Sequence, residues 1–174
     1  MTITIATLSG PFEYPATTFG HLIKEKWLVA AVGESVPPTF LIPITDSESK
    51  DPWFTGDAPE IVFRHTGNNL TQNKAIGDGM FKCEMEIEVH ISCINQQQEF
   101  RYQKHINDLI KEWRRNPILK YSENPSPVDS GLKMFNPLGI NWRTAPDGDP
   151  ESAQDITHTH SFGKITAVWF EHRS

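Results

Sequence analysis

The clearest pattern in the chain is an unbroken alternation of apolar and polar residues from 80 to 92, MFKCEMEIEVHIS. Successive side chains of a β-strand point to opposite faces, so this pattern predicts one long strand with an apolar face and a polar face. The polar face carries Glu84, Glu86 and Glu88. A face that only has to be soluble more often mixes charges of both signs. The function of this acidic face is the question that the sequence raises.

Two segments have the periodicity of amphipathic helices. From 15 to 33 apolar side chains recur at helical spacing, and Gly33 is a suitable end for this helix. After Asn95, a suitable N-cap, apolar residues fall at i, i+4, i+7, i+8 and i+11 from Tyr102 to Trp113, which is the strongest helix signal in the chain. The sequence therefore predicts two main helices.

The remaining apolar runs predict shorter strands, and polar segments between them predict loops. Strands are expected at 1–8, 39–44, 60–64, 132–144 (broken at Asn136-Pro137) and 156–174, and inserted loops at 45–59, 65–79 and 120–131. Pro43 suits an edge strand, and apolar residues on both faces from 167 to 170 suit a central last strand. Neighbouring strands without helices between them favour antiparallel pairing. The prediction is a single α+β domain over residues 1–174, with a mostly antiparallel sheet packed against two main helices.

Composition narrows the classes of protein that fit. A length of 174 residues suits one domain, and a net charge of -6 argues against a protein that wraps nucleic acid with its whole surface. A mean hydropathy of -0.45 predicts no membrane association. The N-terminus lacks the features of a signal peptide. Cys83 and Cys93 lie on one face of the predicted strand, about 33 Å apart, so we expect two buried thiols in a reducing cytoplasm.

Candidate catalytic groups are few. Alternate strand carboxylates stand about 6.7 Å apart, a separation that suits an inverting hydrolase, but a solvated polar face is the favoured interpretation. His158 and His160 could share a zinc ion, with His172, His90 or a carboxylate as third ligand, although a polar strand surface is the default. No nucleotide-binding loop is present. We therefore expect a protein that is not an enzyme and has no cofactor or metal, with a small metal-dependent enzyme using His158 and His160 as the alternative.

Other residues are candidates for contacts with partners. Trp53 and Phe54 form an aromatic pair in a polar loop, which is typical of an interface. Arg114 and Arg115, at the end of the second predicted helix, form the densest basic patch and would contact a neighbouring subunit or phosphate.

The order of these features resembles the tail terminator (tail completion, minor tail) proteins of long-tailed bacteriophages. The matching segments are APEIVFRHTG, FKCEMEIEVHI, QQEFRYQKHINDLIKEWRRN and the final GINWRTAPDGDPESAQDITHTHSFGKITAVWFEHR, so the resemblance covers residues 57–173. The start of the chain, residues 37–57 and residues 120–131 are additions to this pattern.

The resemblance implies a structural protein of the virion, assembled in the host cytoplasm. Such proteins form a homo-hexameric ring on the head-proximal end of the tail tube, stop its polymerisation and meet the head-tail connector or neck protein. DNA passes through the ring without specific binding. A different neck or connector ring is the alternative within this class.

The resemblance also assigns roles to two regions. The acidic face of Glu84, Glu86 and Glu88 would line the channel and repel phosphate. The predicted loop 65–79 would contact the tail tube, with these candidate residues: Asn68, Asn69, Leu70, Gln72 and Lys74.

Overall fold

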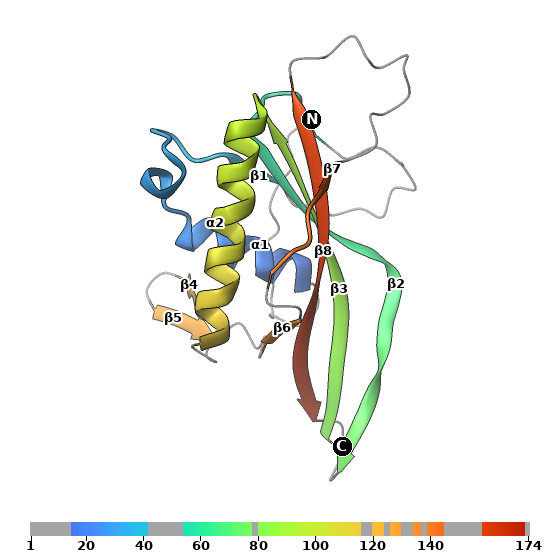
Figure 1. Cartoon of the computed structure of the whole chain (residues 1–174). Coiled ribbons are helices and arrows are strands. Elements are labelled where there is room, and N and C mark those ends of the chain that lie inside the picture. The colour runs from blue at the N-terminus through green and yellow to red at the C-terminus, as the bar shows by residue number, and fades with distance from the viewer. Residues whose placement is uncertain are drawn as a thin grey trace.

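A long twisted sheet with two helices against one of its faces makes up this protein, as the computed structural model in Figure 1 shows. The structure describes residues 15–41, 54–77, 80–115, 120–123, 126–129, 134–136, 139–144 and 158–172. Its helices are α1 (Pro15–Lys26), the 3-10 helix η1 (Val29–Val32) and α2 (Gln96–Arg115). Its strands are β1 (Thr39–Leu41), β2 (Glu60–Gly77), β3 (Met80–Cys93), β4 (Lys120–Glu123), β5 (Ser126–Asp129), β6 (Met134–Asn136), β7 (Arg143–Thr144) and β8 (Thr159–His172).

In the described part of the chain, the main sheet has six strands in the order β1-β2-β3-β8-β6, with β7 also paired to β8. Among these strands β1 runs parallel to its neighbour, and the other pairs are antiparallel. This confirms the predicted α+β class, the mostly antiparallel sheet and the two main helices. β8 has partners on both sides, as expected for a central strand, and β1 lies at the edge.

The predicted loops at 65–79 and 120–131 are wrong in their described parts. Residues 65–77 continue β2, which pairs with β3 through three register shifts as far as Gly77 opposite Met80. Residues 120–123 and 126–129 form the hairpin β4–β5. Polar and glycine-rich composition suggested loops, but strand pairing with the strongly patterned β3 outweighs local propensity. Of the third predicted loop, 45–53 lie outside the described residues, and 54–59 contain neither helix nor strand.

The first predicted helix is shorter than expected. Its α-helical part ends at Lys26, and residues 29–32 form the separate 3-10 turn η1. Gly33 ends this turn in the left-handed conformation, with φ of 70°. Glycine adopts this conformation without steric cost, which explains why the chain stops here.

The start of α2 is set by local hydrogen bonds. The Asn95 side chain accepts a bond of 2.9 Å from the Gln98 amide, and the Gln98 side chain accepts one of 2.9 Å from the Ile94 amide. This reciprocal pair satisfies amides that have no partner within the helix. No helix of the described part is long and apolar enough to cross a membrane.

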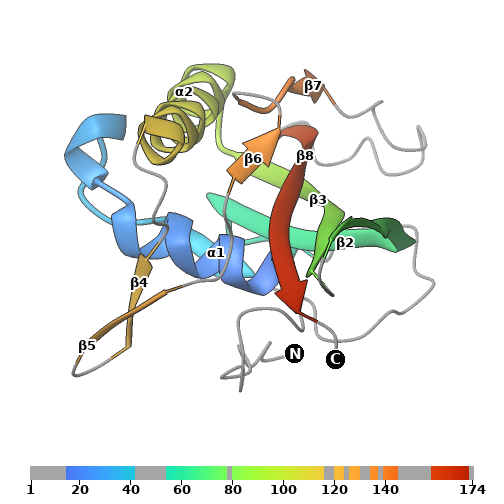
Figure 2. The same cartoon turned by 90° about the horizontal axis from the view of Figure 1, so that it is seen from below.

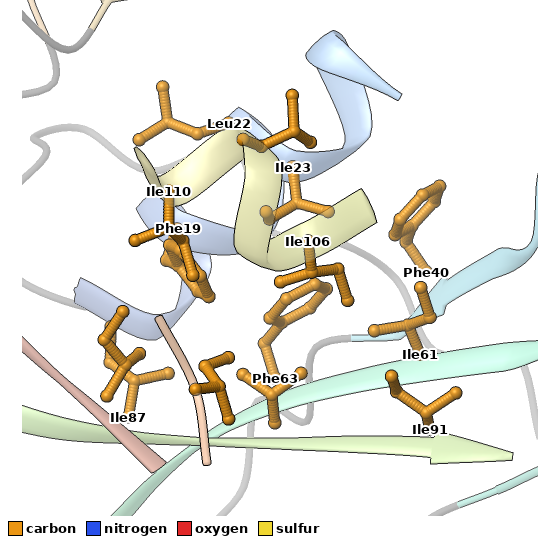
Figure 3. Packing of buried hydrophobic residues seen from close by; sticks show 14 of the residues in the cluster. Phe19, Leu22, Ile23, Phe40, Ile61, Phe63, Ile87, Ile91, Ile106 and Ile110 are labelled. Carbon is orange, nitrogen blue, oxygen red and sulfur yellow. The ribbon is translucent and has the colours of Figure 1, made fainter. Parts of the chain in front are cut away.

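The core lies between the helices and one face of the sheet, which we call the inner face (Figure 3). Phe19 of α1 packs edge-on against Phe63 of β2 and Trp113 of α2, with ring centroids 5.6 and 6.2 Å apart. Ile87 of β3 and Ile106 of α2 are fully buried in the same cluster. Burial of each large side chain stabilises the fold by about 1.5–3 kcal/mol. The apolar residues of β3 thus hold both helices against the inner face.

Beyond the helices, β2, β3 and β8 continue as a three-stranded ribbon (Figure 1). Its register runs to Gly77 opposite Met80 and to Met80 opposite His172. Figure 2, viewed from below, shows α1 and α2 on the same side of these strands. We call this extension the ribbon; it is defined by residues 72–77, 80–83 and 169–172.

A short connection crosses the sheet at Gly163 of β8. Asn107 of α2 holds this connection, since its side chain accepts a 2.7 Å hydrogen bond from the Ile140 amide and donates one of 3.2 Å to the Ile140 carbonyl. Any side chain at Gly163 would overlap it, because an added Cβ would lie 2.0 Å from Ile140 Cγ2 and 3.0 Å from the Asn141 carbonyl oxygen. The absence of a side chain is therefore required for the crossing.

We predict that Gly163→Ala lowers the free energy of unfolding by about 1–3 kcal/mol, the usual cost of an extra methyl group in a filled site. Urea denaturation of the variant and the natural chain measures this difference. Lys164→Ala at the next, exposed position is the control, and we expect a change within about 0.5 kcal/mol. An alanine at 163 without effect would contradict the close crossing.

Candidate functional site

The polar side chains of the central strands meet on the face of the sheet that points away from the helices, which we call the outer face. Strand register places Arg64 of β2 beside Glu88 of β3, and Glu88 beside Lys164 of β8. One pair further along, His90 of β3 lies beside Phe162 of β8. Residues directly opposite each other on neighbouring strands have contacting side chains, so this register builds a continuous polar site.

Glu88 is the central charge of this site. It is buried, with 7% of its surface exposed. Arg64 Nε lies 2.5 Å from Glu88 Oε2, and His90 Nε2 lies 3.2 Å from the same oxygen. Burial alone would raise the pKa of Glu88, but its interactions with His90 and Arg64 outweigh burial and lower the pKa to about 2. Glu88 is therefore an ionised group of the protein's own structure at neutral pH.

A histidine pair continues the site toward β8. His90 Nδ1 and His160 Nε2 are 3.0 Å apart, which is hydrogen-bonding distance. Phe162 stacks on His90, and Phe54 meets His160 edge-on, with ring centroids 5.6 and 5.0 Å apart. Burial and the neighbouring His90 lower the pKa of His160 to about 4, against the opposing effect of Glu88. We call Arg64, Glu88, His90 and His160 the outer-face cluster.

The segment that precedes β2 is tied to the same face by a second acid. Glu60 is completely buried, and its carboxylate accepts hydrogen bonds from the amides of Thr55 and Gly56 at 3.1 and 3.3 Å. The Thr55 hydroxyl donates to the same carboxylate. A buried carboxylate needs several donors to offset the loss of hydration, and this turn supplies them.

The prediction that Glu84, Glu86 and Glu88 together form an acidic channel lining has to be corrected for Glu88. Glu88 is buried and paired, so it does not present a negative charge to the surroundings. Glu86 Oε1 lies 3.0 Å from Lys164 Nζ, and both Glu84 and Glu86 are half-buried. The alternation predicted the face of each glutamate, but the positive charges that balance two of them come from β2 and β8.

Phe54 also differs from its predicted role. It was expected to be an exposed contact for a partner, but it is half-buried against His160 of the same chain. Its predicted companion Trp53 lies outside the described residues.

The other predicted contact residues fall where only the backbone is described. Arg114 and Arg115 form the last positions of α2. Five residues that were expected in a loop are part of β2: Asn68, Asn69, Leu70, Gln72 and Lys74. Their contact with a tail tube stays a prediction.

The hypothesis of a zinc ion shared by His158 and His160 finds no ligand set among the described residues. His160 faces His90, and no group of three or more His, Cys, Asp or Glu side chains that could hold a metal ion occurs in the part of the chain that the structure describes. Cys93 is fully buried, and burial raises the pKa of its thiol, which disfavours the reactive thiolate. The described donors thus form hydrogen bonds and ion pairs with each other.

Sequence reasoning missed Arg64 and the partnership of His90 with His160. The alternation of β3 already put Glu88 and His90 on one face, two residues apart. Nothing local indicates which residues of β2 and β8 stand beside them, because a shift of one residue in register would turn each of those side chains to the other face.

We predict that Glu88→Gln lowers the free energy of unfolding by about 2–3 kcal/mol at pH 7, since the amide leaves the Arg64 guanidinium without its ionic partner. The pKa of Glu88 is lower in the folded chain, about 2 against an ordinary 4.5. Its contribution is therefore complete above pH 4.5 and is lost as the pH falls through 2.

Urea denaturation at pH 7, 5 and 3 measures this dependence. The difference between variant and natural chain should shrink by more than half between pH 5 and pH 3. An equal difference at all three values would mean that the charge of Glu88 does not stabilise the fold.

Comparison with known proteins does not identify this chain. Neither a protein-family model nor a curated protein matches it.

Proposed function

We propose that this protein is a structural subunit of a phage particle. In this proposal it forms a ring, a homo-hexamer, on the head-proximal end of the tail tube, stops tube polymerisation and offers a surface to the head-tail connector or neck protein. The order of sequence features that resembles tail terminator proteins supports this assignment. The α+β domain that the structure shows is compatible with it.

The ribbon is the observation that carries the proposal. Three strands continue past the helices that cover the rest of the sheet (Figure 1). A single subunit thus extends its strands beyond the part of the sheet that its own helices cover, and extended strands of this kind can pair with or pack against another chain. A subunit of an assembly could use the ribbon to contact its neighbours. The outer-face cluster is a weaker candidate for such contacts, because its groups form hydrogen bonds and ion pairs with each other.

The channel role is proposed for Glu84 and Glu86 alone. Both are half-buried and stand on the outer face next to the ribbon, with Glu86 3.0 Å from Lys164, whereas Glu88 is buried and paired with Arg64. A channel wall that carries carboxylates would let DNA slide, because phosphate is repelled and no counterions are released by binding.

Shortening the ribbon tests its proposed role in assembly. Thr71 and Glu84 are partners in the register of β2 and β3, so residues 72–83 can be replaced by a two-residue Asn-Gly turn that keeps the remaining pairs. We expect this shortened chain to fold but to lose ring formation on tail tubes. Negative-stain images of each protein mixed with its cognate tail tubes measure the number of capped ends.

The melting temperature and the circular dichroism spectrum of the shortened chain serve as the control for folding. A folded, shortened protein that still caps tubes at their normal length would contradict the role of the ribbon. A natural chain that never binds tube ends, and sediments with filled heads instead, would favour the alternative neck or connector ring.

The second prediction concerns the channel. The double variant Glu84→Lys with Glu86→Lys should give complete particles of reduced infectivity, because DNA would bind to the wall during passage. Glu112→Lys, the same reversal at an exposed position of α2, is the matched control and should leave infectivity unchanged. Full infectivity of the double variant would overturn the channel role.

A further inference from the structure

Residues 54–56 are fastened to the outer face at two points. Phe54 packs edge-on against His160 of β8, with ring centroids 5.0 Å apart. The amides of Thr55 and Gly56 donate to the buried Glu60 carboxylate at 3.1 and 3.3 Å. The segment contains neither helix nor strand, so these side-chain contacts hold it against the sheet, as backbone hydrogen bonds hold a strand.

The contact of Phe54 with His160 depends on the hydrogen bond between His160 and His90. Only one hydrogen can lie between the two facing nitrogens of this bond. His90 Nδ1 and His160 Nε2 face each other at 3.0 Å. One of the two nitrogens has to be unprotonated to accept, and the other donates. Either ring can be the donor, and His90 Nε2 lies 3.2 Å from Glu88 Oε2 without a hydrogen bond to it.

A second proton on the pair removes this bond. Both facing nitrogens would then carry hydrogen, and two imidazolium ions would stand at hydrogen-bonding distance from each other. Phe54 and Phe162 cover the two rings, so water does little to screen the repulsion.

We propose that the His90–His160 pair is a proton-operated latch, which holds residues 54–56 against the outer face and releases them when both imidazoles are protonated. This role is independent of the proposed ring and concerns the attachment of a segment within one subunit.

The charges around the pair do not replace the missing bond. On β3, Glu88 is already neutralised by Arg64 of β2, whose Nε lies 2.5 Å from its carboxylate. On β8, Lys164 is paired with Glu86, at 3.0 Å. Four other charged or titratable residues belong to the neighbouring segments. Asp57 and Glu60 lie before and at the start of β2, Arg143 lies on β7, and His158 precedes β8.

The sign of the pH dependence follows from His160. Its pKa is lowered from the ordinary 6.5 to about 4, mainly by burial and further by His90, so the closed latch favours the neutral ring. The closed state has its full advantage above pH 6.5 and loses it as the pH falls toward 4. From these two values the equilibrium between open and closed states shifts roughly 20-fold toward open between pH 7 and pH 5.

Amide hydrogen exchange of the full chain at pH 7 and pH 5 tests the latch. After correction for the intrinsic pH dependence of exchange, protection of Thr55 and Gly56 should fall roughly 20-fold, while amides within α2 should keep theirs. Unchanged protection of residues 55 and 56 would overturn the proposal.

Two variants separate the latch from its neighbours. His160→Phe keeps an aromatic ring against Phe54 but cannot be protonated, so the protection of Thr55 and Gly56 should become independent of pH. His158→Gln removes the histidine two positions before His160 and should leave the pH dependence intact. If His160→Phe retained the natural pH dependence, the pair would not be responsible for it, and the latch would be wrong.

Discussion

The constraint on which this structure depends is that the central strand β3 has to bury both of its faces. Its inner face meets the two helices, with Ile87, Val89 and Ile91 fully buried. Its outer face carries Glu88 and His90, which are also buried although one is ionised. Apolar burial satisfies the first face without specific partners, whereas the second requires a partner for the charge of Glu88 and for the inward ring nitrogen of His90, Nδ1.

That requirement organises the neighbouring elements. Arg64 has to come from β2 at the register position beside Glu88, and His160 has to come from β8 within reach of His90. The same face then fastens residues 54–56, because His160 offers a ring to Phe54. A buried ion pair adds less to stability than apolar packing of equal volume, but removal of one partner is costly, so such a site enforces one strand register.

A second region of the sheet is organised by close approach and not by charge. Asn107 of α2 holds Ile140 by two hydrogen bonds, and Ile140 can lie across β8 only because residue 163 is glycine. α2 is also tied to β8 through Gln103, whose side chain donates to Ser161 Oγ at 2.9 Å. These contacts fix the helix over the covered part of the sheet, and the ribbon extends beyond it (Figure 1).

The sequence by itself determined the α+β class, the long strand β3 with its two faces, and the helix α2 with its Asn95 cap. Each of these follows from short-range periodicity or from hydrogen bonds between near neighbours, which a linear pattern contains. The length of β2 and the hairpin β4–β5 were decided by pairing, which outweighed their polar composition. Only the tertiary structure decided that Glu88 is a buried, paired ion and that His160 meets His90, because these contacts join residues 24 and 70 positions apart and depend on strand register.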